Sequence, residues 1–118
     1  MKNLFVVLFV FAFAKAYTQE TYDVKANYNK QEVTIEMRDG IKLHTTIYSP
    51  KDTSKTYPIV MQRTPYSCRP YGEDQFRSKI GPNTYMMEDG YIIVYQDVRG
   101  RWMSEGKYDN MRAYIPNK

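Results

Sequence analysis

Two residue types that carry much of enzyme chemistry are almost missing from this sequence. Among its 118 residues, Cys68 is the only cysteine and His44 is the only histidine. A lone cysteine excludes an intrachain disulfide, and one cysteine with one histidine is too few for a Cys/His metal site. No serine has a glycine both two positions before it and two positions after it, so a G-x-S-x-G elbow is missing as well. The chain therefore holds no complete Ser–His–acid triad, and we assign no nucleophile, acid or base within it.

A surplus of charge of one sign is also missing. The 17 Lys and Arg residues against 13 Asp and Glu residues give a formal net charge of +4. Segment 1–16 contains two of the lysines, so the remainder carries 4 − 2 = +2. The remaining charges of both signs are interleaved and form no basic patch. The composition therefore argues against a nucleic-acid partner.

The one long apolar run stands at the start of the chain. Segment 1–16, "MKNLFVVLFVFAFAKA", has a lysine at position 2, a central apolar stretch, and alanines at 14 and 16 that fit an A-x-A cleavage site. This pattern is typical of a secretory signal peptide, and the run is too short to span a bilayer comfortably. We expect export to the periplasm or the medium without a stable membrane anchor. A retained N-terminal anchor is the alternative.

Alternating apolar residues on both sides of an Asp-Gly turn predict an antiparallel hairpin. The two segments are "EVTIEM" (32–37) and "IKLHTTIY" (41–48). Their apolar residues fall at every second position and are expected on the buried face of the sheet: Val33, Ile35, Met37, Ile41, Leu43 and Ile47. His44 is out of phase with this set, so we expect it to face away from the core.

Further along, two apolar segments predict strands separated by a helix. The strands are "YPIVMQR" (57–63) and "YIIVYQDV" (91–98), and a helix is expected within 73–89, interrupted near Gly81-Pro82. Such a crossover makes the two strands parallel. The predicted fold class is α/β: an antiparallel hairpin leads into a mostly parallel sheet, which is how α/β-hydrolase sheets begin. The fold is incomplete, because so few helices cannot cover both faces. We expect this domain over 31–118, after a loose polar arm at 17–30.

Three segments carry a family resemblance, in the order "MRDGIKLHTTIYSP", "MQRTPYS" and "EDGYIIVYQDVRGRWMSEGKYDNMR". Together they closely resemble the N-terminal part of the serine hydrolase family that holds X-Pro dipeptidyl-peptidases, cocaine esterase and α-amino acid ester hydrolases. They are nearest to the α-amino acid ester hydrolase and glutaryl acylase branch. The resemblance covers residues 33–118. It implies a hydrolase of ester or amide acyl bonds that works through an acyl-enzyme, needs no cofactor, and acts on small esters, amides or short peptides.

In the resembled family the tyrosine of "RTPY" donates its side-chain hydroxyl to the oxyanion hole, and here that residue is Tyr66. The residues themselves suit this role. Pro65 has a fixed φ and pushes Thr64 into an extended conformation, so the chain leaves the strand stiffly. A phenol is a neutral hydrogen-bond donor at working pH. The family's serine, acid and histidine come later in its chains, so we expect this chain to be an N-terminal fragment that is inactive alone.

Other polar residues near the strand end also invite a catalytic interpretation. Asp97, Arg99 and Gly100 follow a predicted parallel strand, where open α/β sheets bind ligands. An Asp and an Arg at this spacing more often order a loop, and the resembled family does not use them in its triad. We interpret all three as structural. Ser104 begins "SEGK", which matches the S-x-x-K pattern, but that mechanism needs a serine at the start of a helix.

Two alternatives stay open at this point. Arg69 next to Cys68 favours the thiolate, so a lowered thiol pKa is the alternative to an incidental cysteine. For the whole chain, the alternative is a small exported β-rich binding module whose ligand surface is built from some of its 12 tyrosines. Ordinary sheet packing accounts for most of these tyrosines.

Overall fold

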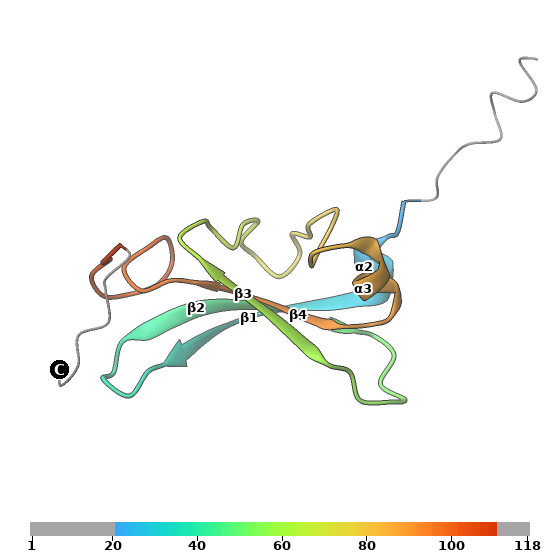
Figure 1. The fold of residues 1–118 in the computed structure, drawn as a ribbon, viewed down its shortest axis with the longest axis horizontal. Coiled ribbons are helices and arrows are strands. Elements are labelled where there is room, and N and C mark those ends of the chain that lie inside the picture. The colour runs from blue at the N-terminus through green and yellow to red at the C-terminus, as the bar shows by residue number, and fades with distance from the viewer. Residues whose placement is uncertain (1–20, 111–118) are drawn as a thin grey trace, which may run out of the picture.

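A computed structural model describes residues 21–110; the predicted signal peptide and residues 111–118 lie outside the described part. The elements in chain order are α2 (Val24–Asn27), β1 (Tyr28–Glu36), β2 (Lys42–Pro50), β3 (Ile59–Thr64), α3 (Thr84–Glu88) and β4 (Ile92–Asp97). The strands form one 4-stranded sheet in the order β1-β2-β4-β3 (Figure 1). Within residues 21–110, no helix is long and apolar enough to cross a membrane.

The strand pairing agrees with the predicted topology. β1 and β2 form the antiparallel hairpin, with Thr34 opposite His44. β2 pairs antiparallel with β4, and β3 pairs parallel with β4, with Thr64 opposite Asp97 at their carboxyl ends. The antiparallel hairpin and the parallel pair predicted from the sequence are therefore confirmed.

The helix predicted within 73–89 is present only after the predicted interruption, over Thr84–Glu88, and the stretch before Gly81-Pro82 is not helical. The Asn83 side chain accepts a hydrogen bond from the Met86 N–H (3.0 Å) and so caps the helix at its start. Gly81 has a φ of +71°, which is left-handed. Pro82 follows it and has no N–H to donate. A helix cannot pass through this pair, and the chain before it runs as a loop.

The expectation of a loose arm over 17–30 is wrong for the part that the structure describes. The Asp23 side chain accepts from the Ala26 N–H (3.0 Å) and caps α2. Val24 and Tyr28 are both buried in the core. Tyr28 donates its hydroxyl to the Met87 carbonyl at 3.0 Å. A one-turn helix is too short to produce an apolar period, so the sequence pattern did not reveal this segment.

The sheet has one covered face and one open face. The loop that follows β3, together with α2 and α3, lies on one side of the sheet (Figure 1). The core beneath them consists of Val24, Tyr28, Tyr48, Cys68, Ile80, Met87, Ile93 and Tyr95. On the other face, Ile59 is 66% exposed and Met61 is 47% exposed.

The apolar set of the predicted hairpin lies mainly on the open face. The register places Val33 and Ile35 of β1 on the same side as Met61. Ile35 is exposed and Val33 is half-buried, although Leu43 on the same face is buried. The expectation that this whole set is buried is therefore wrong for these described residues. A period of two shows which side chains share a face, but not which face a distant loop will cover.

The expectation that His44 faces away from the core is wrong for the same reason. Only 8% of His44 is exposed. Its ring packs edge-on against Tyr71, with ring centroids 5.2 Å apart. Its Nε2 lies 4.0 Å from the Glu32 carboxylate. The covered face is therefore the one that carries His44 and Glu32.

A buried ion pair fastens the loop after β3 to this face. The Lys30 ammonium donates to Glu32 Oε1 at 2.7 Å, to the Pro70 carbonyl at 2.6 Å and to the Gly72 carbonyl at 2.7 Å. The Gly72 N–H donates back to Glu32 Oε1 at 2.8 Å. All three donor positions of the lysine are thus used, as a buried ammonium requires. Lys30 belongs to the predicted arm, so its role depends on contacts that the sequence pattern does not show.

We expect Lys30→Met to lower the free energy of unfolding by about 3 kcal/mol or more, because it leaves Glu32 largely buried without its cation. Urea denaturation of the protein that contains this chain measures the change. Lys79 is exposed, so Lys79→Met is a matched control that should stay within about 0.5 kcal/mol of the wild type. Equal stabilities of the two variants would contradict the anchoring role of Lys30.

Glu32 also predicts a pH dependence of stability. Burial acts to raise the pKa of Glu32, but hydrogen bonds from Lys30 and the Gly72 N–H, together with the Lys30 charge, outweigh it and hold this pKa below its ordinary 4.5. Because the folded-state pKa is lowered, ionised Glu32 stabilises the fold above pH 4.5 and loses this contribution as the pH falls through the folded-state pKa.

The advantage of the wild type over Glu32→Gln should therefore be constant well above pH 4.5 and shrink progressively below it. Thermal unfolding of both proteins through an acid series measures this difference. The other carboxylates are present in both proteins, so their contributions to the pH dependence cancel in this difference. A difference that does not change with pH would show that Glu32 is not held ionised by its partners.

Candidate active-site edge

Tyr66 lies at the carboxyl edge of the parallel strands. β3 ends at Thr64 and β4 ends at Asp97, and these two residues are register partners. The segments that follow the two strands therefore meet at one edge of the sheet, where open α/β sheets bind ligands. The Tyr66 side chain is 77% exposed instead of packing into the core.

The Asp97 carboxylate organises this edge from inside. Asp97 is fully buried. Its Oδ1 accepts from the Cys68 N–H at 2.8 Å. Its Oδ2 accepts from the Tyr71 hydroxyl at 2.8 Å and from the Met103 N–H at 3.3 Å. Both oxygens are occupied by the protein's own donors, so the carboxylate ties the loop after β3 to the turn after β4.

Arg99 and Gly100 shape the turn after β4. The Arg99 guanidinium makes two bonds to the Asp39 carboxylate, at 2.7 and 3.1 Å, and so connects this turn to the hairpin turn. These hydrogen bonds hold the pKa of Asp39 below its ordinary value. Gly100 has a left-handed φ of +70°, and a Cβ there would collide with the main-chain nitrogen of Tyr108. Only glycine fits this close approach.

Ser104 lies at a structural position. Its hydroxyl donates to the Asp97 main-chain oxygen at 2.7 Å and accepts from the main-chain N–H of His44 at 2.9 Å. Ser104 is buried between these partners. The hydroxyl therefore joins β2 to the end of β4, and the S-x-x-K match carries no chemistry.

The structure decides between the alternatives for Cys68. The residue is buried in the core. Burial raises the pKa of its thiol far above the ordinary value, and the Asp97 carboxylate beside it acts in the same direction. A lowered thiol pKa caused by Arg69 is therefore wrong. The Arg69 guanidinium instead lies over the Trp102 ring, 5.5 Å from its centroid.

Sequence reasoning missed two residues at this edge, Tyr71 and Trp102, and also Lys30, which holds the loop after β3 from β1. Tyr71 belongs to the loop after β3, and both burial and the Asp97 carboxylate raise the pKa of its hydroxyl. Nothing in the sequence separates Tyr71 from the other tyrosines, because its role depends on Asp97, which is 26 positions away. Trp102 donates its indole N–H to the Pro65 carbonyl at 2.9 Å. Trp102 is the only tryptophan in the sequence, and this was the only sequence feature that distinguished it.

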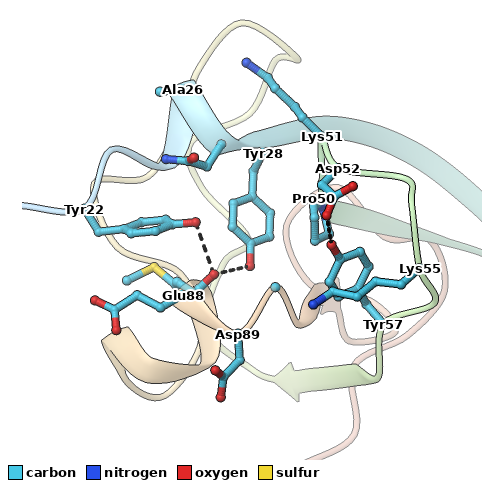
Figure 2. A pocket seen from close by; sticks show the side chains of 13 residues that line it. Tyr22, Ala26, Tyr28, Pro50, Lys51, Asp52, Lys55, Tyr57, Glu88 and Asp89 are labelled. Carbon is cyan, nitrogen blue, oxygen red and sulfur yellow. Dashed lines mark hydrogen bonds between the residues drawn. The ribbon is translucent and has the colours of Figure 1, made fainter.

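A hollow of about 270 Å³ lies at the opposite end of the sheet (Figure 2). Figure 2 shows the hydroxyls of Tyr22 and Tyr28 directed at the Met87 carbonyl, at 3.1 and 3.0 Å. Tyr57 donates its hydroxyl to the Asp52 carboxylate at 2.7 Å. These groups are used to hold the fold, so the candidate site remains at the carboxyl edge. Among residues 21–110, no group of three His, Cys, Asp or Glu side chains is arranged to hold a metal ion.

The mixed sheet, with its antiparallel start and its exposed tyrosine at the carboxyl edge, is the beginning of an α/β-hydrolase fold. Residues 39–114 match the family of X-Pro dipeptidyl-peptidases, S15. The chain belongs to this family. The family and the fold class predicted from the sequence are thereby confirmed.

Individual relatives agree with this assignment. Cocaine esterase from Rhodococcus sp. (strain MB1 Bresler) is 33% identical over 88 residues, which cover 72% of this chain and 14% of the esterase. A solved α-amino acid ester hydrolase has 40% identity and a TM-score of 0.60, over 80% of this chain and 16% of that chain. A solved aminopeptidase from the marine sediment archaeon Thaumarchaeota archaeon has 38% identity and a TM-score of 0.60, over 78% of this chain and 16% of that chain. The chain spans only about one-sixth of the length of these solved relatives.

Proposed function

We propose that this chain is the N-terminal part of the catalytic domain of an exported serine hydrolase that cleaves ester or amide acyl bonds through an acyl-enzyme. The observation that carries the proposal is the exposed Tyr66 at the carboxyl edge of β3, next to the end of β4. The names of the relatives support an acyl bond in a small ester or peptide as the substrate. Export is proposed from the signal-peptide pattern of residues 1–16.

Tyr66 has a defined task in this mechanism. When a serine attacks the substrate carbonyl, the C=O bond becomes a C–O⁻ bond, and the negative charge gathers on that oxygen. The Tyr66 hydroxyl donates a hydrogen bond to this oxyanion, and a main-chain N–H elsewhere in the whole protein supplies the second donor. The serine, its histidine base and the orienting acid belong to the parent protein outside these 118 residues. No step needs a cofactor.

The open sheet face favours this proposal over a small binding module. Ile59 and Met61 on β3 and Ile35 on β1 are large apolar side chains that stay exposed on this face. In a larger α/β domain, further elements cover both faces of such a sheet. The tyrosines also fit better with packing than with a ligand surface, because Tyr28, Tyr48 and Tyr95 lie in the core.

The first test is to read the gene beyond Lys118. We expect a G-x-S-x-G sequence within the next several dozen codons, followed by an acid and then a histidine. This order places the nucleophile on the turn after a further parallel strand. A continuous open reading frame without that elbow would remove the hydrolase proposal.

The second test addresses Tyr66 in the full-length enzyme. Tyr66→Phe removes only the hydroxyl, so kcat for an ester substrate should fall by about 10²- to 10³-fold. Tyr85 is similarly exposed, at 76% against 77%, and Tyr85→Phe is the matched control that should leave kcat unchanged. Steady-state kinetics of both variants decide the question. An unaltered kcat in Tyr66→Phe would take the oxyanion role away from this residue.

A further inference from the structure

The main chain around Tyr66 is held at two points, one on each side. On the N-terminal side, the Trp102 indole N–H donates to the Pro65 carbonyl at 2.9 Å. On the C-terminal side, the Cys68 N–H donates to Asp97 Oδ1 at 2.8 Å. Tyr66 and the residue after it span the distance between these points. The exposed side chain therefore rises from a short segment of backbone that is fixed at both ends.

Trp102 is itself held in place. The guanidinium groups of Arg69 and Arg101 both lie over its ring, 5.5 and 5.4 Å from the ring centroid. Its backbone has a φ of +54° and is the only non-glycine residue with positive φ within residues 21–110. A bulky residue in this region carries strain that the surrounding structure must hold.

Packing does not account for this arrangement. Trp102 is about half exposed, so the burial of its apolar surface does little to offset the backbone strain. Apart from the contact with its neighbour Arg101, its interactions are the hydrogen bond to the residue before Tyr66 and the contact with Arg69, three positions after Tyr66. Both of them act on the same short segment.

We propose that Trp102 is a positioning residue for Tyr66: its indole N–H fixes the Pro65 carbonyl and so sets the direction in which the Tyr66 hydroxyl points. The inference rests on the proposed function, in which Tyr66 donates to the oxyanion. Catalysis of this kind depends on a donor that is already oriented before the charge develops. The turn after β4 thus determines the geometry of a donor that belongs to the loop after β3.

The test uses the full-length enzyme and compares single and double variants. Trp102→Phe keeps an aromatic ring for the two arginines to contact but removes the N–H donor. We expect kcat to fall by about 3- to 10-fold while KM changes by less than about 2-fold, as the loss of one orienting hydrogen bond predicts. In a Tyr66→Phe background, where no hydroxyl remains to be oriented, Trp102→Phe should change kcat little.

Two further variants serve as a control and as a replacement for Trp102→Phe. Met103 is an exposed neighbour in the same turn and reaches Asp97 only through its main-chain N–H, which a leucine keeps, so Met103→Leu should retain the wild-type kcat. If Trp102→Phe does not fold, 3-benzothienylalanine at position 102 replaces the indole N–H with sulfur in the same shape and should reproduce the loss in kcat.

The outcomes separate the two proposals. A normal kcat in Tyr66→Phe overturns the oxyanion role, and the role of Trp102 falls with it. A large loss in Tyr66→Phe, combined with an unchanged kcat in both position-102 variants or with losses that multiply independently in the double variant, overturns only the role of Trp102.

Discussion

The candidate site depends on one buried carboxylate. Asp97 ends β4 and is fully buried, and a buried charge is tolerated only when its oxygens accept hydrogen bonds. The donors come from Cys68 and Tyr71 in the loop after β3, and from Met103 in the turn after β4. Because one carboxylate needs all of these donors, the two segments that follow the parallel strands cannot be arranged independently.

The buried lysine applies a second constraint to the same loop from β1, the strand at the far edge of the sheet. Lys30 and Glu32 on β1 hold the main chain at Pro70 and Gly72. Together with the bond from Trp102 to Pro65, these contacts fix the loop at several points along its length. Tyr66 is exposed, yet it stands on a backbone that has little freedom. An oxyanion donor needs this combination of access for the substrate and prior orientation.

The two faces of the sheet show how the chain relates to its longer relatives. The covered face is closed by the chain's own loop and short helices, around aromatic and polar side chains that include Tyr48 and His44. The open face carries aliphatic side chains, among them Ile59 and Met61. The chain matches only 14–16% of the length of its relatives. A sheet that is covered on one face and aliphatic on the other fits the edge of a larger α/β domain.

The sequence by itself determined the antiparallel hairpin and the parallel pair, because alternation, an Asp-Gly turn and a crossover are local signals. The order of the strands across the sheet, with β2 next to β4, came only from the structure. The sequence also determined the family and singled out Tyr66, through the "RTPY" motif. Only the tertiary structure decided which sheet face is buried, and therefore the burial of His44 and Cys68. It alone assigned Lys30 and Trp102 to the support of the loop around Tyr66. Their hydrogen-bond partners in this loop lie 37 or more positions away in the chain. No local pattern records a contact between segments that only folding brings together.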